Sequence, residues 1–360
     1  MKKLTWLLAL TLMFAMALSA CGTAATPTAA PVQTEAPVMT EAPATEAPAT
    51  VAPTKAPAAK PFRVAVVMPS AINDLAFSQS MYDALTRIQT EMGGPDKFEF
   101  VYSENMFVVD DAAAAIRDYA SQGYDLVIAH GSQYGSSLQE IAPDFPKTSF
   151  AWGTTSDTFG QPNIFSYEAA ADEGGYVNGV MAAKLSTSKV IGVVGPIETG
   201  DAKLYIDGFK AGVAATDPSV TVNVNYIGSF SDVALASEAA TTHISAGADV
   251  LTGTAQMVVG AIGKAKESKA LWFGTQSNQT SLAPDIVVAS QVYHWEGALK
   301  DMIAKIQAGT FGGESFKITL ANGGEVIEFN PDYKLPDDVK TLADTTIAGI
   351  SDGSIKITMP

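Results

Sequence analysis

Cysteine is almost absent from this chain of 360 residues, which contains only one, Cys21. A single thiol excludes a disulfide framework within the chain, and it excludes metal centres built from several thiolates. Cys21 lies where an apolar stretch ends and a tract of Thr, Ala and Pro begins. Because Cys21 has no second thiol to pair with, we look for its function in its position at this junction.

Positive charge is also scarce. Lys and Arg number 22 against 38 Asp and Glu, so the formal net charge is −16, or −18 without Lys2 and Lys3. A strongly acidic chain is repelled by nucleic acids and by anionic lipid surfaces. We therefore expect neither to be a partner of the folded part. After residue 20, no apolar run approaches the roughly 17 residues that a membrane span needs.

Histidine is the third scarce residue. His130, His243 and His294 lie far apart, without the spacing of metal ligands. In residues 131–135 (GSQYG) the serine is misplaced for a nucleophile elbow, and residues 192–203 (GVVGPIETGDAK) lack the lysine and hydroxyl of a phosphate loop. We therefore expect no enzyme, no metal and no cofactor. His243 falls in a helix-like run and is expected on the surface.

The N-terminus has the anatomy of a signal peptide. Two lysines precede residues 4–20, which are mostly apolar and end in small residues before Cys21. An uncleaved membrane anchor is the alternative, since the run is close to the length of a membrane span. Residues 18–21 (LSAC) resemble the lipobox of bacterial lipoproteins, in which the thiol carries diacylglycerol and the cysteine becomes the first residue. We therefore expect a signal peptide at 1–20, a lipid on Cys21, and anchorage on the extracytoplasmic face of a bacterial cell membrane.

Residues 21–60 have the composition of a tether. The motif TEAP occurs at 34–37, 40–43 and 45–48, and no aromatic residue is present. Such a segment buries too little surface to offset its conformational entropy, so it should stay extended and disordered. Thr beside Pro could also carry glycans.

The remainder, residues 61–360, alternates strands with amphipathic helices, which predicts a doubly wound α/β architecture. Its length favours two lobes. We expect one lobe at 61–162 plus 293–313 and the other at 163–292 plus 314–360. The predicted strands are short, apolar and β-branched, and they span residues 62–68, 126–130, 149–153, 189–195, 220–228, 248–253, 270–274 and 285–290.

Ligands of open α/β sheets lie beyond the carboxyl ends of the strands. The segments that follow the predicted strands are rich in aromatic and amide side chains, which can sandwich a flat ring and hydrogen-bond its edge. The alternatives are that single aromatics pack in the core, that Asp74 and Asp232 cap helices, and that Gln276 is a hinge residue. The candidate ligand-binding residues are Asn73, Asp74, Phe77, His130, Gln133, Tyr134, Trp152, Phe230, Gln256, Gln276, Tyr293 and Trp295.

Several ordered motifs resemble the basic membrane protein family, whose substrate-binding lipoproteins deliver purine nucleosides or related compounds to ABC importers. The resemblance covers residues 62 to about 355, and it implies two lobes joined by several crossings of the chain, as in type I periplasmic-binding proteins. It rests on INDLAFSQSMYDAL at 72–85, EAAADEGGYVNGVMAAKL at 168–185 before KVIGVVG, YIGSFSD at 226–232 and FGTQSNQ at 273–279.

The resemblance implies roles for five of the candidates. Phe77, with Phe230 or Tyr134, would cover the faces of a base. Asn73 and Asp74, at the start of the first helix, would contact its polar edge or its sugar. The remaining partners implied are an ABC permease in the membrane and a small heterocyclic ligand, with the protein acting as a monomer.

Two departures from the family pattern concern the ligand. Gln276 stands where nucleoside-binding members usually carry an aspartate, and Tyr293 stands where they carry a lysine. A charged aspartate accepts strong hydrogen bonds from ribose hydroxyls. The resemblance therefore favours a free purine or related heterocycle over a nucleoside. A ligand-sensing lipoprotein and a surface adhesin are the alternative functions.

The predicted anchor is tested by the Cys21→Ala variant. Lipid labelling should be lost and the protein should leave the membrane fraction, because neither the tether nor the lobes have apolar surface to replace the acyl chains. Incorporation of labelled fatty acid and membrane sedimentation measure both effects. Continued sedimentation of the variant with membranes would contradict the lipoprotein interpretation.

Overall fold

The computed structural model describes residues 60–359. The predicted signal peptide, Cys21 and nearly all of the tether lie outside the described residues. The residues described belong to one structural unit, and within them no helix is both long and apolar enough to cross a membrane.

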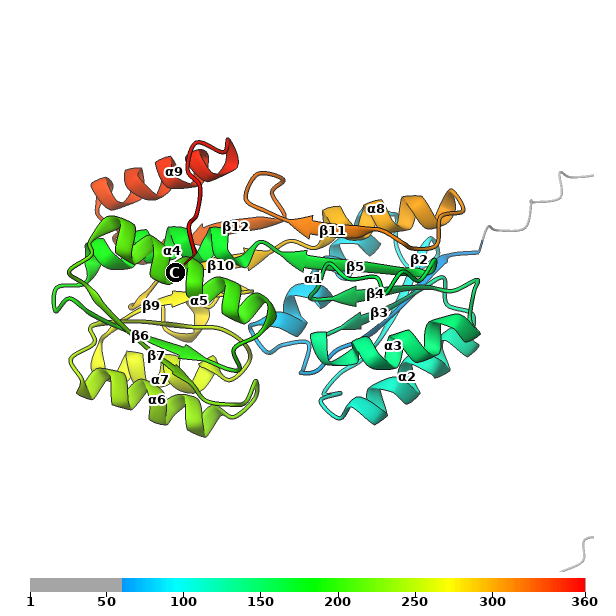
Figure 1. Ribbon diagram of the computed structural model, residues 1–360, viewed down its shortest axis with the longest axis horizontal. Coiled ribbons are helices and arrows are strands. Elements are labelled where there is room, and N and C mark those ends of the chain that lie inside the picture. The colour runs from blue at the N-terminus through cyan, green and yellow to red at the C-terminus, as the bar shows by residue number, and fades with distance from the viewer. Residues whose placement is uncertain (1–59, 360) are drawn as a thin grey trace, which may run out of the picture. The chain divides into compact units, whose positions relative to one another are not determined.

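The first of two sheets is wholly parallel and has six strands. Helices α1 (Phe77–Glu91) and α8 (Glu296–Gln307) contribute to the core on one face of this sheet, and α2 (Val109–Ser121) and α3 (Gly135–Ile141) cover the other (Figure 1). The strand order is β11 (Ser315–Ile318), β5 (Ile164–Ala169), β4 (Ser149–Gly153), β3 (Leu126–His130), β1 (Phe62–Val67) and β2 (Phe98–Ser103).

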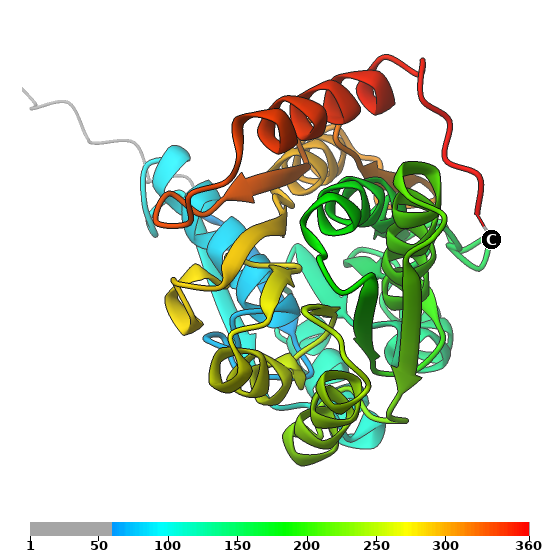
Figure 2. The same ribbon diagram turned by 90° about the vertical axis from the view of Figure 1, so that its left-hand side faces the viewer.

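The second sheet is parallel except at one edge, where β12 pairs antiparallel with β10. Helices α4 (Ala171–Leu185), α5 (Gly200–Thr216) and α9 (Asp337–Ser351) lie on one side, and α6 (Val233–Ser245) and α7 (Val258–Ser268) on the other (Figures 1 and 2). Its order is β12 (Glu325–Phe329), β10 (Val287–Tyr293), β9 (Leu271–Gly274), β8 (Val250–Gly253), β6 (Val190–Gly195) and β7 (Thr221–Tyr226).

The chain passes between the sheets three times, from β5 to α4, from β10 to α8 and from β11 to β12. This arrangement confirms the predicted fold class of two doubly wound lobes joined by several crossings. The expected boundaries at 162/163 and 313/314 need correction, because β5 and β11 follow these points and yet pair within the first sheet. β5 pairs with β4 and β11 pairs with β5. The sequences of the two strands do not indicate these pairing partners.

The three crossings meet at one buried carboxyl group. The Oε1 atom of Glu325, at the start of β12, accepts a hydrogen bond of 2.8 Å from the backbone N–H of Gly174 on α4. The side chain of Gln291 on β10 donates to the same oxygen and also to the Ala171 carbonyl, at 3.0 Å. Glu325 therefore links residues next to each crossing.

Helices α4 and α5 pack with their backbones close together. A Cβ atom on Gly179 would lie 2.1 Å from the Phe209 carbonyl oxygen, and one on Gly212 would lie 2.1 Å from that of Tyr176. Glycine at these two positions permits the close contact. The contact fixes α5, whose first turn lies at the candidate site described below.

The expectation that His243 is exposed is wrong. The side chain is 2% exposed, and its Nε2 lies 3.1 Å from the Val193 carbonyl oxygen. Burial lowers the pKa of His243. The helical pattern around it is rich in alanine, so the buried face could not be identified from large apolar residues.

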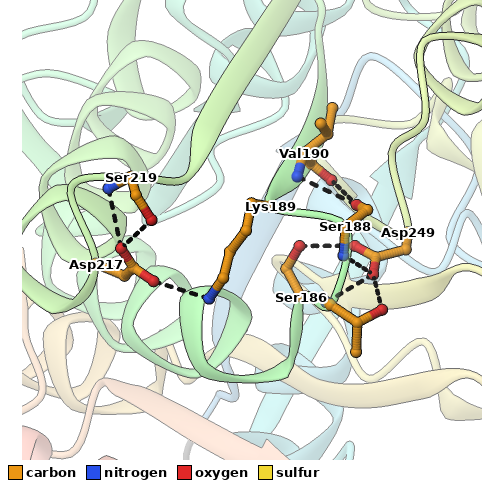
Figure 3. Close-up of polar contacts among 8 residues, drawn as sticks. Ser186, Ser188, Lys189, Val190, Asp217, Ser219 and Asp249 are labelled. Carbon is orange, nitrogen blue, oxygen red and sulfur yellow. Dashed lines mark hydrogen bonds and ion pairs between the residues drawn. The ribbon is translucent and has the colours of Figure 1, made fainter.

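Asp249 holds the loop between α4 and β6 in place (Figure 3). Its carboxylate accepts hydrogen bonds from the Ser186 hydroxyl at 2.7 Å, the Thr187 N–H and hydroxyl at 2.7 Å, and the Ser188 N–H at 2.8 Å. Burial alone would raise the pKa of Asp249, but these bonds outweigh it and lower the pKa to about 2. Nearby Asp217 pairs at the surface with Lys189, at 2.8 Å (Figure 3).

The Asp249→Asn variant should lower the free energy of unfolding by about 2 kcal/mol at pH 7, because an amide cannot accept from all these donors. The depressed pKa means that this stabilisation is present at neutral pH and is lost as the pH falls from about 4 towards 2. Denaturant titration measures the change. Asp144→Asn is the control and should cost less than about 1 kcal/mol, because it breaks the exposed ion pair of Asp144 with Arg117. Equal losses in the two variants would contradict the role given to Asp249.

Candidate functional site

A cavity lies where the carboxyl ends of strands from both sheets meet. It offers about 60 Å³ to the centres of water molecules. Loops after β1, β2, β3 and β4 line it from the first sheet, and loops after β6, β7, β8 and β9 line it from the second. The lining side chains include Phe77, Gln133, Asp201, Phe230, Gln256 and Gln276.

Aromatic rings form part of the wall. Phe77 is the first residue of α1, and its ring stacks on the imidazole of His130 with centroids 3.7 Å apart. Because His130 covers one face of this ring, the opposite face and the edge remain for the cavity. Phe230, from the loop after β7, contributes a second ring that is half-buried.

His130 supports Phe77 from behind. Its Nε2 lies 3.0 Å from the Phe77 carbonyl oxygen, which can only accept, so Nε2 carries the proton and donates. Its Nδ1 then accepts from the Tyr167 hydroxyl at 2.8 Å. Burial lowers the pKa of His130 to about 3, so the ring is neutral at physiological pH. Its role is to hold the ring of Phe77 in position.

The polar part of the wall has unpaired groups. The side-chain oxygens Oε1 of Gln256, Oε1 of Gln276 and Oδ2 of Asp201 are buried and have no hydrogen-bond partner among the described residues. Leaving such a group unpaired costs about 1–3 kcal/mol. Three of them in one cavity indicate a polar ligand that completes their hydrogen bonds.

Two cavity residues have backbones in the left-handed region. Ala255, after β8, has φ = +78°, and Gln276, after β9, has φ = +68°. Such strain costs of the order of 1–3 kcal/mol and is concentrated at binding sites. The Gln276 carbonyl accepts from the Tyr293 N–H at 3.1 Å, which helps to hold this conformation.

Asp201 is the one titratable side chain among the described residues that line the cavity. It lies in the first turn of α5 and is 6% exposed. Burial raises its pKa to about 8, and the negative charge of Glu168 acts in the same direction. A backbone hydrogen bond from Ala169 and the positive charge of Lys317 lower the pKa but do not outweigh these effects.

The structure brings five of the predicted residues to the cavity: Phe77, Gln133, Phe230, Gln256 and Gln276. His130 lies directly behind one of them. Phe230 and Tyr134 are the two residues suggested to cover the base together with Phe77, and of these Phe230 lines the cavity. Tyr134 is fully buried instead, and its hydroxyl donates to the Met106 carbonyl at 2.8 Å.

Asn73, Asp74 and Trp152 do not line the cavity. Asn73 is exposed. Asp74 accepts from the backbone N–H groups of residues 76, 78 and 79 at 2.8, 3.1 and 3.1 Å, as a helix cap does. Trp152 stacks on Phe159 with centroids 4.7 Å apart, and its indole N–H donates to the Gly131 carbonyl at 3.2 Å.

Tyr293 and Trp295 pack near a crossing of the chain. Their rings meet edge to face with centroids 5.1 Å apart, and the Trp295 indole N–H donates to the Ser80 hydroxyl at 2.9 Å. Both side chains are almost fully buried and neither lines the cavity. The family departure at Tyr293 therefore lies outside the wall, whereas the one at Gln276 lies within it.

Sequence reasoning missed Asp201, together with Phe107, Thr154 and Thr199. The available signal for Asp201 is its position after the strand that ends at Gly195, the same rule that identified Gln256 and Gln276. A carboxyl in a loop is more often exposed, so its burial could not be read from the sequence.

Loops of the two sheets are joined beside the cavity. The Ser277 hydroxyl, after β9, donates to the Ala76 carbonyl at 2.8 Å. The Gln279 amide donates to the Leu75 carbonyl at 3.2 Å. These bonds connect the second sheet to the start of α1, which carries Phe77.

Comparison with known proteins agrees with this geometry. The family described as ABC transporter substrate-binding protein, PnrA-like, matches residues 62–357. A purine-binding protein of Brucella abortus is 28% identical over 260 residues, covering 72% of this chain and 73% of that protein. The nucleoside-binding protein BmpA of an ABC transporter from Lactococcus lactis is 26% identical over 313 residues, covering 81% and 86%. A solute-binding protein from Conexibacter woesei has a similar fold, with a TM-score of 0.68 and 22% identity, covering 83% and 99%.

The cap at the start of α1 gives a test of Asp74. Asp74→Ala should lower the free energy of unfolding by about 1–2 kcal/mol, because helix N–H groups lose their acceptor. Denaturant titration measures the loss. The adjacent Asn73→Ala variant, at an exposed side chain, is the control and should stay within about 0.5 kcal/mol of the parent protein. An unchanged stability of Asp74→Ala would show that the carboxylate is not a cap.

Proposed function

Because the chain belongs to the PnrA-like family of ABC transporter substrate-binding proteins, we propose that it captures a free purine base or a closely related heterocycle in the cavity between the sheets. The observation that carries the proposal is the combination of aromatic rings with buried, unpaired polar groups in one cavity. Phe77 and Phe230 offer apolar surface to a flat ring, and Gln256, Gln276 and Asp201 face its polar edge.

The size of the cavity supports a base more than a base with a sugar. One water molecule takes roughly 10–15 Å³ when the space is counted by the positions of its centre. The 60 Å³ found here is thus room for a handful of waters, comparable to one small ring system. Gln276, where nucleoside-binding members usually carry an aspartate, supports the same choice.

The names of relatives support the ligand class. The Brucella abortus protein is named purine-binding, and the Lactococcus lactis protein is named nucleoside-binding. Both names concern molecules that contain a purine or pyrimidine ring. The cavity residues described above favour the ring itself as the part that is recognised.

We further propose that the protein is anchored through a lipid on Cys21 and passes its ligand to an ABC permease outside the cytoplasm. The LSAC motif and the tether composition support the anchor. The bonds of Ser277 and Gln279 to the start of α1 support a closed form in which the two lobes enclose the ligand.

Replacement of either ring tests the ligand class. On ligand-stripped protein, Phe77→Ala and Phe230→Ala should each weaken binding of the best base by roughly 10- to 100-fold, because a stacking surface is lost. Calorimetry with adenine, guanine, hypoxanthine and their nucleosides measures the affinities. Phe311→Ala removes a ring that is 36% exposed and outside the cavity, and it should leave the affinities unchanged.

Two results would contradict this proposal. If no base binds to the parent protein with a dissociation constant below about 100 μM, which corresponds to roughly 5.5 kcal/mol, then the ligand is not a purine. If nucleosides bind clearly more tightly than the bases, the choice of a free base is wrong.

A further inference from the structure

Asp201 differs in kind from the other polar groups of the cavity wall. The amide of a glutamine can rotate to present either a donor or an acceptor, so Gln256 and Gln276 adapt to several ligands. An ionised carboxylate only accepts. Asp201 has one oxygen, Oδ2, that is buried without a partner, while a backbone hydrogen bond from Ala169 already satisfies part of the group. In the ionised form, the vacant oxygen therefore requires a donor from the ligand, whereas in the protonated form the carboxyl can itself donate.

The direction of the Asp201 side chain is set by the helix that carries it. It lies in the first turn of α5, and α5 is fixed by its close contact with α4. A side chain on a packed helix holds its direction better than one on a free loop. The carboxyl is also 94% buried, so water competes poorly for Oδ2.

We propose that Asp201 selects purines that carry an exocyclic amino group, with its ionised carboxylate accepting an N–H of that group. The inference rests on the proposed function, since it names which purines the cavity takes. An amino group is a donor only, and it matches an oxygen that can only accept. Where the ligand carries a carbonyl oxygen at the same place, two acceptors would face each other once the carboxyl is ionised, whereas the protonated carboxyl would donate to that oxygen.

The surroundings of Asp201 couple this contact to pH. Near Asp201, Glu168 on β5 and Lys317 on β11 form an ion pair of 2.9 Å. The charge of Glu168 raises the pKa of Asp201, and the charge of Lys317 lowers it. The hydroxyls of Tyr167 and Tyr293 also feel the charge of Asp201, but burial raises both pKa values well above the ordinary range, so they stay neutral. His130, which stacks on Phe77, has a pKa of about 3 and does not titrate near neutral pH.

Affinity for an aminopurine should rise with pH. The pKa of free Asp201 is raised to about 8, so below pH 8 the carboxyl must release its proton to accept the amino group. Affinity for an aminopurine should therefore rise by roughly 50-fold between pH 6 and pH 8, and level off above it. A ligand that presents a carbonyl oxygen instead pairs with the protonated carboxyl, so its affinity should fall as the pH rises through 8.

The first experiment compares adenine and guanine with hypoxanthine, which has the same rings and no amino group. Calorimetry on stripped parent protein at pH 8 should show at least one aminopurine binding roughly 10- to 100-fold more tightly than hypoxanthine, as expected for a hydrogen bond to a charged group. In Asp201→Asn this preference should vanish or reverse. The remaining carbonyl oxygen is kept by Ala169, and the new NH₂ faces the ligand.

The matched control is Asp207→Asn on the same helix. It removes the same charge from a residue that pairs with Lys203 and does not line the cavity. Its base preference and pH profile should equal those of the parent protein. Thermal unfolding of both variants reports whether each is folded.

The second experiment follows the affinity of the parent protein for its preferred aminopurine from pH 6 to pH 8, which needs no variant. The expected rise, and its absence in Asp201→Asn, support the proposal. Hypoxanthine binding as well as the aminopurines, a flat or falling pH profile, or an unchanged preference in a folded Asp201→Asn protein would each overturn it while purine binding stands. Failure of all three bases to bind the parent protein would overturn the proposed function as well.

Discussion

The structure depends on a buried carboxyl group at the point where the chain crosses between its two sheets. Glu325 accepts hydrogen bonds from the backbone of Gly174 and from the side chain of Gln291, each close to a different crossing. Burial raises the pKa of Glu325 well above its ordinary range. Removing one partner of such a buried network is costly, since the remaining groups are left unpaired. The relative placement of the crossing segments therefore has a specific chemical basis, in addition to general apolar packing.

Placement of the crossings has a direct consequence for the cavity. Because the strands of each sheet are parallel, apart from β12, their carboxyl ends point the same way, and loops from both sheets meet at one place. The first sheet contributes Phe77, held by His130, and the second contributes Phe230, Asp201 and the two amides. Each lobe thus supplies one aromatic ring, and the second lobe also supplies the unpaired polar groups. A ligand that stacks on both rings must contact both lobes, so binding can favour a closed arrangement.

The cavity combines several energetic costs in one place. Asp249 is a half-buried carboxylate that accepts four hydrogen bonds. These bonds favour its charged form and lower its pKa. Asp201 is buried without a comparable set of hydrogen bonds, and its pKa is raised. Gln276 adds a left-handed backbone. Unpaired groups and strain that gather at one cavity are expected where a ligand supplies the missing interactions.

The α/β class and eight of the strands can be read from the amino-acid pattern, because buried parallel strands are continuously apolar and the loops that follow them are polar. The rule that ligands of such sheets lie beyond the strand ends then selects candidate residues. Applied to Phe230, Gln256 and Gln276, that rule identified cavity residues. Applied to Trp152 and Tyr293, it identified rings that pack elsewhere, since the rule reports a strand end and not the direction of a side chain. That β11 joins the first sheet emerges only in the folded chain, because β11 pairs with β5, which lies far earlier in the sequence. The burial of Asp201 emerges there too, because the fold brings β5, whose Ala169 N–H bonds the carboxyl, against the start of α5.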